Sequence, residues 1–177
     1  MDAGHGILYD GGVMTDFKSL IREVDDWPKP GVGFKDVTPI LDTDKFAELI
    51  DAMAERLGDV NTIDAFVGVE SRGFIFAAAL AYKLDKGLIL ARKPGKLPPP
   101  LKSVEYSLEY GADKLEMHEG TGRVVIVDDV VATGGTLSAA TQLARDCGYD
   151  VVDTLCFIDL RFIHSRELDT KCVVTYD

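Results

Sequence analysis

Apolar residues follow two different periods along most of the chain. Spacings of three and four residues from Phe17 to Val24, and again from Phe46 to Leu57, predict two amphipathic helices, the second ended by Gly58. Apolar runs without polar alternation are typical of buried strands, and here they alternate with two further helical stretches. The predicted strands are 65–69, 88–91, 124–127, 151–160 and 172–176, and the further helices are 73–84 and 136–147.

This alternation predicts an α/β fold, with a mostly parallel sheet flanked by helices. We expect a single domain over residues 14–177, because the composition does not change along it. Residues 1–13 have four glycines and no helical period, and we interpret them as an N-terminal extension or an alternative start. The segment from Pro94 to Gly122 breaks the alternation. Its length and its three consecutive prolines indicate a lid, at about 97–119.

Charge limits the partners that the chain can bind. Its 177 residues include 30 acidic and 19 basic side chains, which gives a net charge of -11. We therefore expect no nucleic acid and no membrane as partner, since anionic polymers and surfaces require a basic face. A small phosphorylated substrate is not excluded, because a few cations, backbone N–H groups or a metal ion suffice to bind it.

The three cysteines, Cys147, Cys156 and Cys172, form no C-x-x-C pair and lie in apolar or helical stretches. We interpret them as buried, reduced thiols, which predicts a cytoplasmic protein. No apolar run reaches membrane-spanning length, and the N-terminus does not have the pattern of a secretory signal.

The most distinctive stretch follows the predicted strand 124–127 and reads Asp128-Asp129-Val130-Val131-Ala132-Thr133-Gly134-Gly135-Thr136. The glycines allow a tight turn that exposes N–H groups, the following helix start adds partial positive charge, and the threonines supply hydroxyl donors. These features predict a turn that binds a monophosphate. Two adjacent carboxylates can accept hydrogen bonds from the hydroxyls of a sugar, directly or through a cation. The alternative is a strand–turn–helix with a solvated pair of aspartates.

Residues 125–136 resemble the signature with which type I phosphoribosyltransferases bind phosphoribosyl pyrophosphate (PRPP). The resemblance extends from about Phe17 to Tyr176. It implies that family's fold, a Rossmann-like sheet with an N-terminal base-binding hood and a flexible catalytic lid. It also implies that Asp128 and Asp129 contact the ribose. The residues implied to wrap the 5-phosphate are Ala132, Thr133, Gly134, Gly135 and Thr136.

Two further predicted strand ends carry charged residues. Residues 70–73 resemble the family's pyrophosphate loop, which implies a cis peptide bond between Glu70 and Ser71; the alternative is that Arg72 pairs with Glu70. Residues 92–98 resemble a string that precedes the lid in the adenine-specific branch of the family, although alone they would read as a solvated basic turn. The resemblance assigns pyrophosphate binding to Glu70, Ser71, Arg72, Arg92, Lys93 and Lys96. In that branch the arginine matched by Arg92 serves the neighbouring subunit, which implies a homodimer.

Within the lid, residues 106–111 match a string of the same branch. By this resemblance Glu109 handles a proton at the imidazole edge of the purine, and Tyr110 closes over the reacting centre. Both are therefore expected to be catalytic residues.

Residues 30–39 resemble the branch's hood, which we expect at about 25–40. The resemblance implies adenine contacts by Gly33, Phe34 and Lys35, and by Leu160 at a strand end. Three positions depart from the family's pattern: Gly33 replaces a larger apolar residue, Lys35 an arginine, and Pro99 a small residue.

The implied reaction joins adenine to PRPP and forms AMP and pyrophosphate through an oxocarbenium-like transition state. Mg²⁺ is the implied cofactor, held mainly by PRPP and water rather than by protein side chains alone. One alternative is a hypoxanthine–guanine enzyme of the same fold. Such enzymes read the purine oxygen with a lysine, and none occurs between Thr136 and Lys171. An alternative of another class is a PRPP-sensing regulatory protein, which the acidic charge and the short segment before Phe17 disfavour.

Overall fold

The computed structural model describes residues 15–27, 29–108, 111–164 and 169–177. The chain forms two compact units, Met1–Lys45 and Phe46–Asp177, and we describe each by itself. Among the described residues, no helix is long and apolar enough to cross a membrane.

The first unit is a short antiparallel strand pair. A single 3₁₀ turn, η1 (Phe17–Leu20), leads into β1 (Arg22–Val24), which pairs with β2 (Phe34–Asp36) before the one-turn helix α1 (Thr38–Leu41). The helix predicted from Phe17 to Val24 is therefore wrong. Asp36 is buried and accepts hydrogen bonds from Arg22 Nε at 3.0 Å and Thr38 N at 2.9 Å. The bonds that make 22–24 a strand come from residues about twelve positions later, which a local period cannot reveal.

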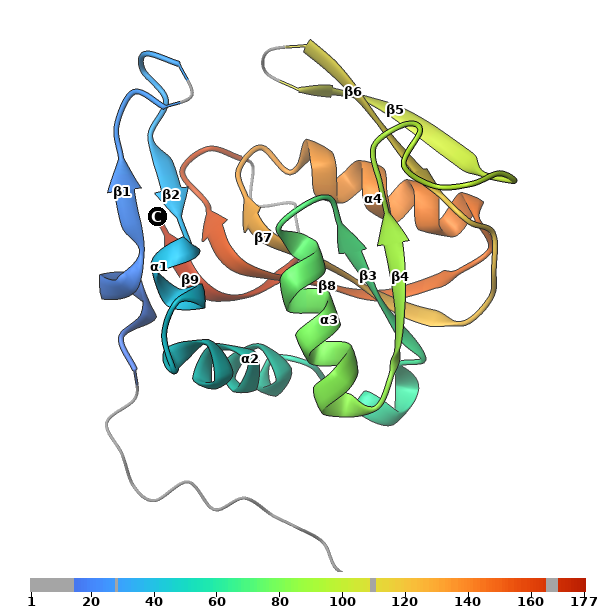
Figure 1. The fold of residues 1–177 in the computed structure, drawn as a ribbon, viewed down its shortest axis with the longest axis horizontal. Helices are drawn as coiled ribbons and strands as arrows, with labels where there is room; N and C mark the ends of the chain where they lie inside the picture. Colours follow the sequence, from blue (N-terminus) through green and yellow to red (C-terminus); the bar gives the residue numbers. More distant parts are fainter. Residues whose placement is uncertain (1–14, 28, 109–110, 165–168) are drawn as a thin grey trace, which may run out of the picture. The chain divides into compact units, whose positions relative to one another are not determined.

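The second unit is built on a five-stranded parallel sheet, as the sequence predicts (Figure 1). The strand order is β4-β3-β7-β8-β9. The strands are β3 (Ala65–Val69), β4 (Gly87–Ala91), β7 (Arg123–Val131), β8 (Asp150–Leu160) and β9 (Lys171–Tyr176). The helices are α2 (Lys45–Glu55), η2 (Val60–Thr62), α3 (Gly73–Leu84) and α4 (Gly135–Asp146).

Successive side chains of each strand point to opposite faces of this sheet, and helices pack on both faces. On one face Phe76 of α3 packs on Phe157 of β8 and on Phe46 of α2, with ring centroids 6.2 and 6.1 Å apart. On the other face Leu137 and Leu143 of α4 belong to the same buried cluster as residues of β3 and β7. Both faces are covered, which explains why the strand sequences are apolar throughout.

Strand β7 is longer than the apolar run that predicts it. Its pairing with β3 ends at Gly68↔Val127, whereas its pairing with β8 continues to Val131↔Asp159. The predicted end at residue 127 is therefore wrong, and Asp128 and Asp129 lie within the strand. Beyond Val127 no described residue of β3 pairs with this strand, and Asp128, Asp129 and Val130 line a pocket there.

The segment predicted to be a lid contains an antiparallel hairpin, β5 (Lys102–Leu108) with β6 (Gly111–Met117), which packs on α4 (Figure 1). Val104 and Tyr106 pack against the core from β5, and Leu115 and Met117 are buried in it from β6. The base of the hairpin therefore belongs to the core. Movement of the lid stays a prediction, and it concerns the part of the hairpin beyond these residues.

Candidate active site

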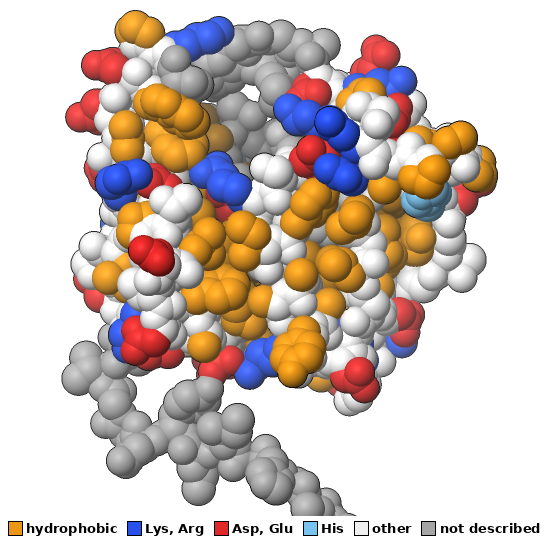
Figure 2. All heavy atoms as spheres, viewed as in Figure 1, with side chains coloured by type: hydrophobic (Ala, Val, Ile, Leu, Met, Phe, Trp, Pro, Cys, Tyr) orange, Lys and Arg blue, Asp and Glu red, His pale blue; other side chains and the backbone are white. Residues whose placement is uncertain are grey.

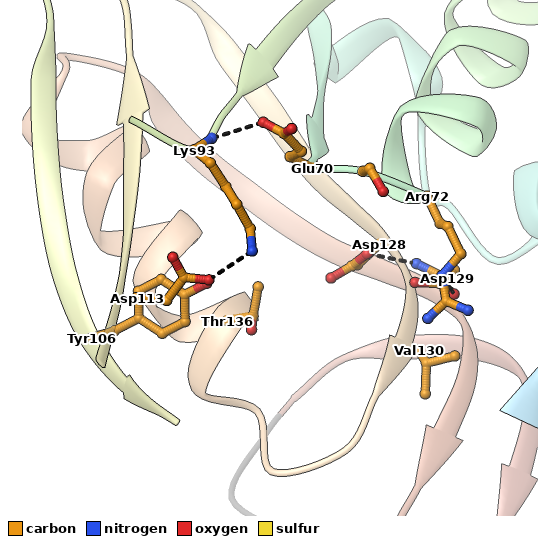
Figure 3. Close-up of a pocket in the computed structure, with 10 residues that line it drawn as sticks. Glu70, Arg72, Lys93, Tyr106, Asp113, Asp128, Asp129, Val130 and Thr136 are labelled. Carbon is orange, nitrogen blue, oxygen red and sulfur yellow. Dashed lines mark hydrogen bonds and ion pairs between the residues drawn. The ribbon is translucent and has the colours of Figure 1, made fainter. Parts of the chain in front are cut away.

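A pocket of about 550 Å³ opens at the carboxyl ends of β3 and β7. Segments that are far apart in the sequence meet around it (Figure 3). The described residues that line it are Glu70, Ser71, Arg72, Lys93, Tyr106, Asp113, Asp128, Asp129, Val130 and Thr136. This is the sheet edge at which ligands bind in open parallel sheets.

The two aspartates of β7 are almost completely buried in this pocket, 9% and 4% exposed. Asp128 Oδ1 accepts a hydrogen bond from the backbone N of Asp129 at 2.9 Å. Burial raises the pKa of Asp128 well above its ordinary value, and the adjacent charge of Asp129 adds to this effect. Burial also raises the pKa of Asp129, although Arg72, whose Nε lies 2.8 Å from Asp129 Oδ2, opposes the shift. The solvated-pair alternative is therefore wrong.

The loop 70–72 connects β3 to α3 and approaches β7 closely. The Glu70–Ser71 peptide bond is cis, as predicted. A Cβ on Gly73 would lie 2.6 Å from the carbonyl oxygen of Val127, so glycine lets the helix begin against the strand. The predicted alternative, in which Arg72 pairs with Glu70, is wrong, because Arg72 forms an ion pair with Asp129 (Figure 3).

Glu70 instead holds the basic string that follows β4. Its Oε2 accepts from Lys93 N at 2.8 Å and from Arg92 Nε at 3.2 Å. The Arg92 guanidinium carbon also lies 5.5 Å from the centroid of the Phe74 ring. Arg92 donates to the carbonyl oxygen of Lys96, and neither of these two is among the lining residues. The predicted pyrophosphate residues thus divide into four that face the pocket and two, Arg92 and Lys96, beside it.

The phosphate-binding turn lies between β7 and α4. Gly134 is the residue before the helix and has a φ of 83°, which favours glycine. Glycine has no side chain to cap the helix, although Gly135 N donates to Thr133 Oγ1 at 3.5 Å, and N–H groups at the start of a helix can bind an anion. Thr136 lines the pocket, whereas Ala132, Thr133 and Gly134 lie in the turn next to it and Gly135 is the first residue of α4.

Three lining residues, Val130, Tyr106 and Asp113, were not among the sequence-predicted site residues. Tyr106 and Asp113 are opposite each other in the hairpin. Alternation of apolar and polar residues over 102–108 was the available signal, since it predicts a strand with Val104 and Tyr106 on one face. The predicted catalytic residues Glu109 and Tyr110 lie outside the described residues.

The predicted adenine contacts belong to different units of the chain. In the first unit, Phe34 packs edge-on against Trp27 with centroids 4.4 Å apart, and Lys35 forms an ion pair with Glu23 across the strands. Among the described residues, no atom lies within 4 Å of a Cβ built on Gly33, so the position has space for the larger side chain of the family's pattern. In the second unit, Leu160 is buried at the end of β8.

Comparison with known proteins identifies the class to which this site belongs. The sequence profile of the phosphoribosyl transferase domain family matches residues 36–177. The chain is 52% identical over 153 residues to the adenine phosphoribosyltransferase of Roseiflexus castenholzii, covering 84% of this chain and 88% of that protein.

Solved structures agree with this similarity. The adenine phosphoribosyltransferase of Thermoanaerobacter pseudethanolicus superposes with a TM-score of 0.84 at 40% identity, over 93% of this chain and all of that one. The enzyme from Saccharomyces cerevisiae, solved with adenine and an imino-altritol bisphosphate, gives 0.81 at 32% identity, over 89% and 95% of the two chains. This chain therefore belongs to the type I phosphoribosyltransferases and, within them, to the adenine phosphoribosyltransferase family.

The burial of Asp128 predicts a conflict between stability and activity. Because its pKa is raised in the folded state, the folded protein binds the proton more tightly, and stability falls as pH rises from the ordinary aspartate range towards the folded pKa. Asp128→Asn keeps the Oδ1 acceptor and removes this charge. We expect a higher melting temperature than wild type at pH 7, a difference that shrinks towards pH about 4, and at least about a 10-fold loss of kcat/KM for PRPP.

Asp129→Asn is the matched comparison, because this carboxylate faces Arg72. We expect the same loss of kcat/KM without the gain in melting temperature. Equal melting temperatures for wild type and Asp128→Asn across this pH range would contradict the cost that we assign to the buried charge.

Proposed function

We propose that this chain transfers the phosphoribosyl group of PRPP to N9 of adenine and forms AMP and pyrophosphate at the pocket of Figure 3. The observation that carries the proposal is the buried acidic pair of β7, next to a glycine turn at the start of α4 and opposite a loop with Arg72. These three features suit, in order, the ribose hydroxyls, the 5-phosphate and the pyrophosphate of one PRPP molecule.

The chain's own residues would fix the substrate rather than attack it. Asp128 and Asp129 would accept hydrogen bonds from the 2- and 3-hydroxyls, and the turn 132–136 would hold the 5-phosphate. Glu70, Ser71, Arg72 and Lys93 would surround the pyrophosphate. With both phosphate ends held, the anomeric carbon stays in line with the incoming N9, and a closed lid would keep water from the oxocarbenium-like centre.

The charges in the pocket are compatible with Mg²⁺ as cofactor. Of the lining residues described, four are acidic and two are basic, which does not suit a polyanionic substrate alone. The carboxylates of Asp128 and Asp129 would supply the protein oxygens that approach the ion, and PRPP and water would supply the remaining ligands. When bound, Mg²⁺ would neutralise charge on the leaving pyrophosphate.

Adenine is favoured over a 6-oxopurine by the end of β8. Asp159 there is 2% exposed and forms an ion pair with Arg161 Nε at 3.2 Å and a hydrogen bond with His164 Nε2 at 2.6 Å. A carboxylate held in this way is not the lysine that would donate to a purine oxygen. The relatives compared above are also named as adenine phosphoribosyltransferases, and none is named as a regulatory protein.

A direct test is a steady-state assay of the purified protein with Mg²⁺, PRPP and one base at a time. We expect AMP formation from adenine at a kcat/KM at least about 100-fold above that for hypoxanthine or guanine, since a site built for one hydrogen-bonding pattern rejects another strongly. Comparable rates with the three bases would refute the assigned base specificity, and no product from any of them would refute the activity.

The resemblance assigns proton handling to Glu109. Its carboxylate would meet the purine N7 mainly in the transition state, so its loss should lower kcat more than it raises KM. We expect Glu109→Gln to lower kcat by about 100-fold, with PRPP affinity by calorimetry unchanged. Glu105→Gln is the matched control, because Glu105 is exposed in the same hairpin. Full kcat in Glu109→Gln would assign the proton to another group or to water.

We also propose a homodimer, with Arg92 serving the partner's site. An exposed apolar face of α3 and the edge strand β4 supports this. Its large side chains are Ile75, Tyr82 and Leu88, exposed by 40%, 92% and 43%. Hydrophobic side chains gather over this part of the molecule in Figure 2. A contiguous apolar area of this kind marks an interface, and it lies on the elements that lead to Arg92.

Sedimentation velocity at assay concentrations tests the dimer. We expect wild type to sediment as a dimer and Tyr82→Asp to shift it to monomers with reduced activity, since a charge on the apolar face opposes association. Val152→Asp, at a side chain that is 41% exposed on β8, should leave the dimer intact. An active wild-type monomer would exclude the role of Arg92 in a partner's site.

We further propose a cytoplasmic location. The three cysteines are free thiols, two of them buried, as expected for a protein of a reducing compartment.

A further inference from the structure

Two residues of the hairpin face the pocket without a role in the reaction described above. Tyr106 of β5 and Asp113 of β6 are paired in register, so their side chains share one face of the hairpin. This is the inner face, because Tyr106 packs against the core together with Val104. In Figure 3 both side chains lie beside Lys93, predicted at the pyrophosphate subsite, and Thr136, predicted at the 5-phosphate subsite.

Asp113 is fully engaged by its neighbours. Oδ1 accepts from Lys114 N at 2.8 Å, Oδ2 lies 3.0 Å from Lys93 Nζ, and the Tyr106 side chain lies next to the carboxylate (Figure 3). Burial alone would raise the pKa of Asp113, but these donors outweigh it and lower the pKa, so the carboxylate stays ionised. Lys93 is thereby fixed at both ends, by Asp113 at its ammonium group and by Glu70 at its backbone N.

Tyr106 reaches the other subsite. Its side chain lies close to the Thr136 side chain, in the first turn of α4, and both line the pocket (Figure 3). Burial is the main reason that the pKa of Tyr106 is raised, so the phenol remains protonated at neutral pH and can donate to Asp113. A continuous chain of adjacent polar side chains therefore runs from Lys93 through Asp113 and Tyr106 to Thr136.

We propose that Asp113 and Tyr106 are positioning residues that link the two phosphate-binding ends of the site. Asp113 holds the Lys93 ammonium group at the pyrophosphate end, and the Tyr106 phenol packs beside the Thr136 side chain at the 5-phosphate end and limits its rotation. Neither touches a reacting atom. Their benefit is that a flexible lysine and a threonine side chain are ordered before PRPP arrives, which reduces the cost of binding. The inference rests on the proposed function, since it takes PRPP as the ligand.

The test uses Asp113→Asn, which keeps an oxygen for Lys114 N, and Tyr106→Phe, which keeps the ring in the core. We expect each to raise KM for PRPP, by about 10-fold and about 5-fold, with kcat within about 3-fold of wild type and KM for adenine unchanged. Because the residues act in one chain of contacts, the double variant should be no worse than Asp113→Asn alone. Glu105→Gln, one residue from Tyr106 on the outer face of β5, is the matched control and should keep the wild-type KM.

Two fragments of PRPP separate the ends of the site. Calorimetry with pyrophosphate and, separately, with ribose 5-phosphate measures each end without catalysis. We expect Asp113→Asn to weaken both and Tyr106→Phe to weaken only ribose 5-phosphate. This pattern is not expected from a general loss of folding, which thermal melting would detect.

Unchanged affinities for both fragments in Asp113→Asn would overturn the proposal, and so would additive losses in the double variant. A wild-type protein that binds both fragments but forms no AMP would instead refute the proposed function. In that case the fragment affinities of the variants still decide whether Asp113 and Tyr106 link the two ends.

Discussion

The site depends on one electrostatic constraint, which is the burial of two adjacent carboxylates at the end of β7. Asp128 and Asp129 repel each other in a region of low solvent access, and the Arg72 ion pair compensates Asp129 more directly than Asp128. Several features follow from holding that arrangement in place. Strand β7 extends past its β3 partner, α3 begins at a glycine that tolerates contact with β7, and the loop 70–72 brings Arg72 to the pair. Because Arg72 compensates Asp128 less directly, the pair favours a ligand that brings hydroxyl donors and a cation.

The hairpin β5–β6 extends this logic to the rest of the pocket. Its base is part of the core, so its inner face presents Tyr106 and Asp113 from a fixed support. Glu70 also positions Lys93, because its carboxylate accepts a hydrogen bond from the backbone N of Lys93. The phosphate-binding residues are thus placed by carboxylates and a phenol that themselves contact other protein groups. A polyanion can then bind to a protein of net charge -11, since local order rather than overall charge decides its affinity.

The sequence could predict the parallel sheet, the helices α2, α3 and α4 and the phosphate-binding turn. Hydrophobic periodicity and the glycines and prolines that end helices and strands are local signals. The short strand β1 could not, since its partner β2 lies about twelve residues away and residues 17–24 also satisfy a helical spacing. The partner of Arg72 could not be predicted either, because Asp129 is far from it in the sequence and only the fold brings the two together. Tyr106 lies in the matched string 106–111 but was given no role, and Asp113 lies outside that string; the pairing of β5 with β6 brings both side chains to the pocket.

The central claim is that burial disfavours the ionised form of Asp128 until its ligand binds. NMR titration of the aspartate side-chain carboxyl carbons tests this claim most directly. The resonance of Asp128, assigned by its loss in Asp128→Asn, should titrate above the ordinary aspartate range in the free protein, since burial raises its pKa. With saturating Mg²⁺ and PRPP, and without adenine, its titration should move to lower pH, because hydroxyl donors and the cation stabilise the ionised form. An ordinary aspartate titration in the free protein, unchanged by PRPP, would contradict the account.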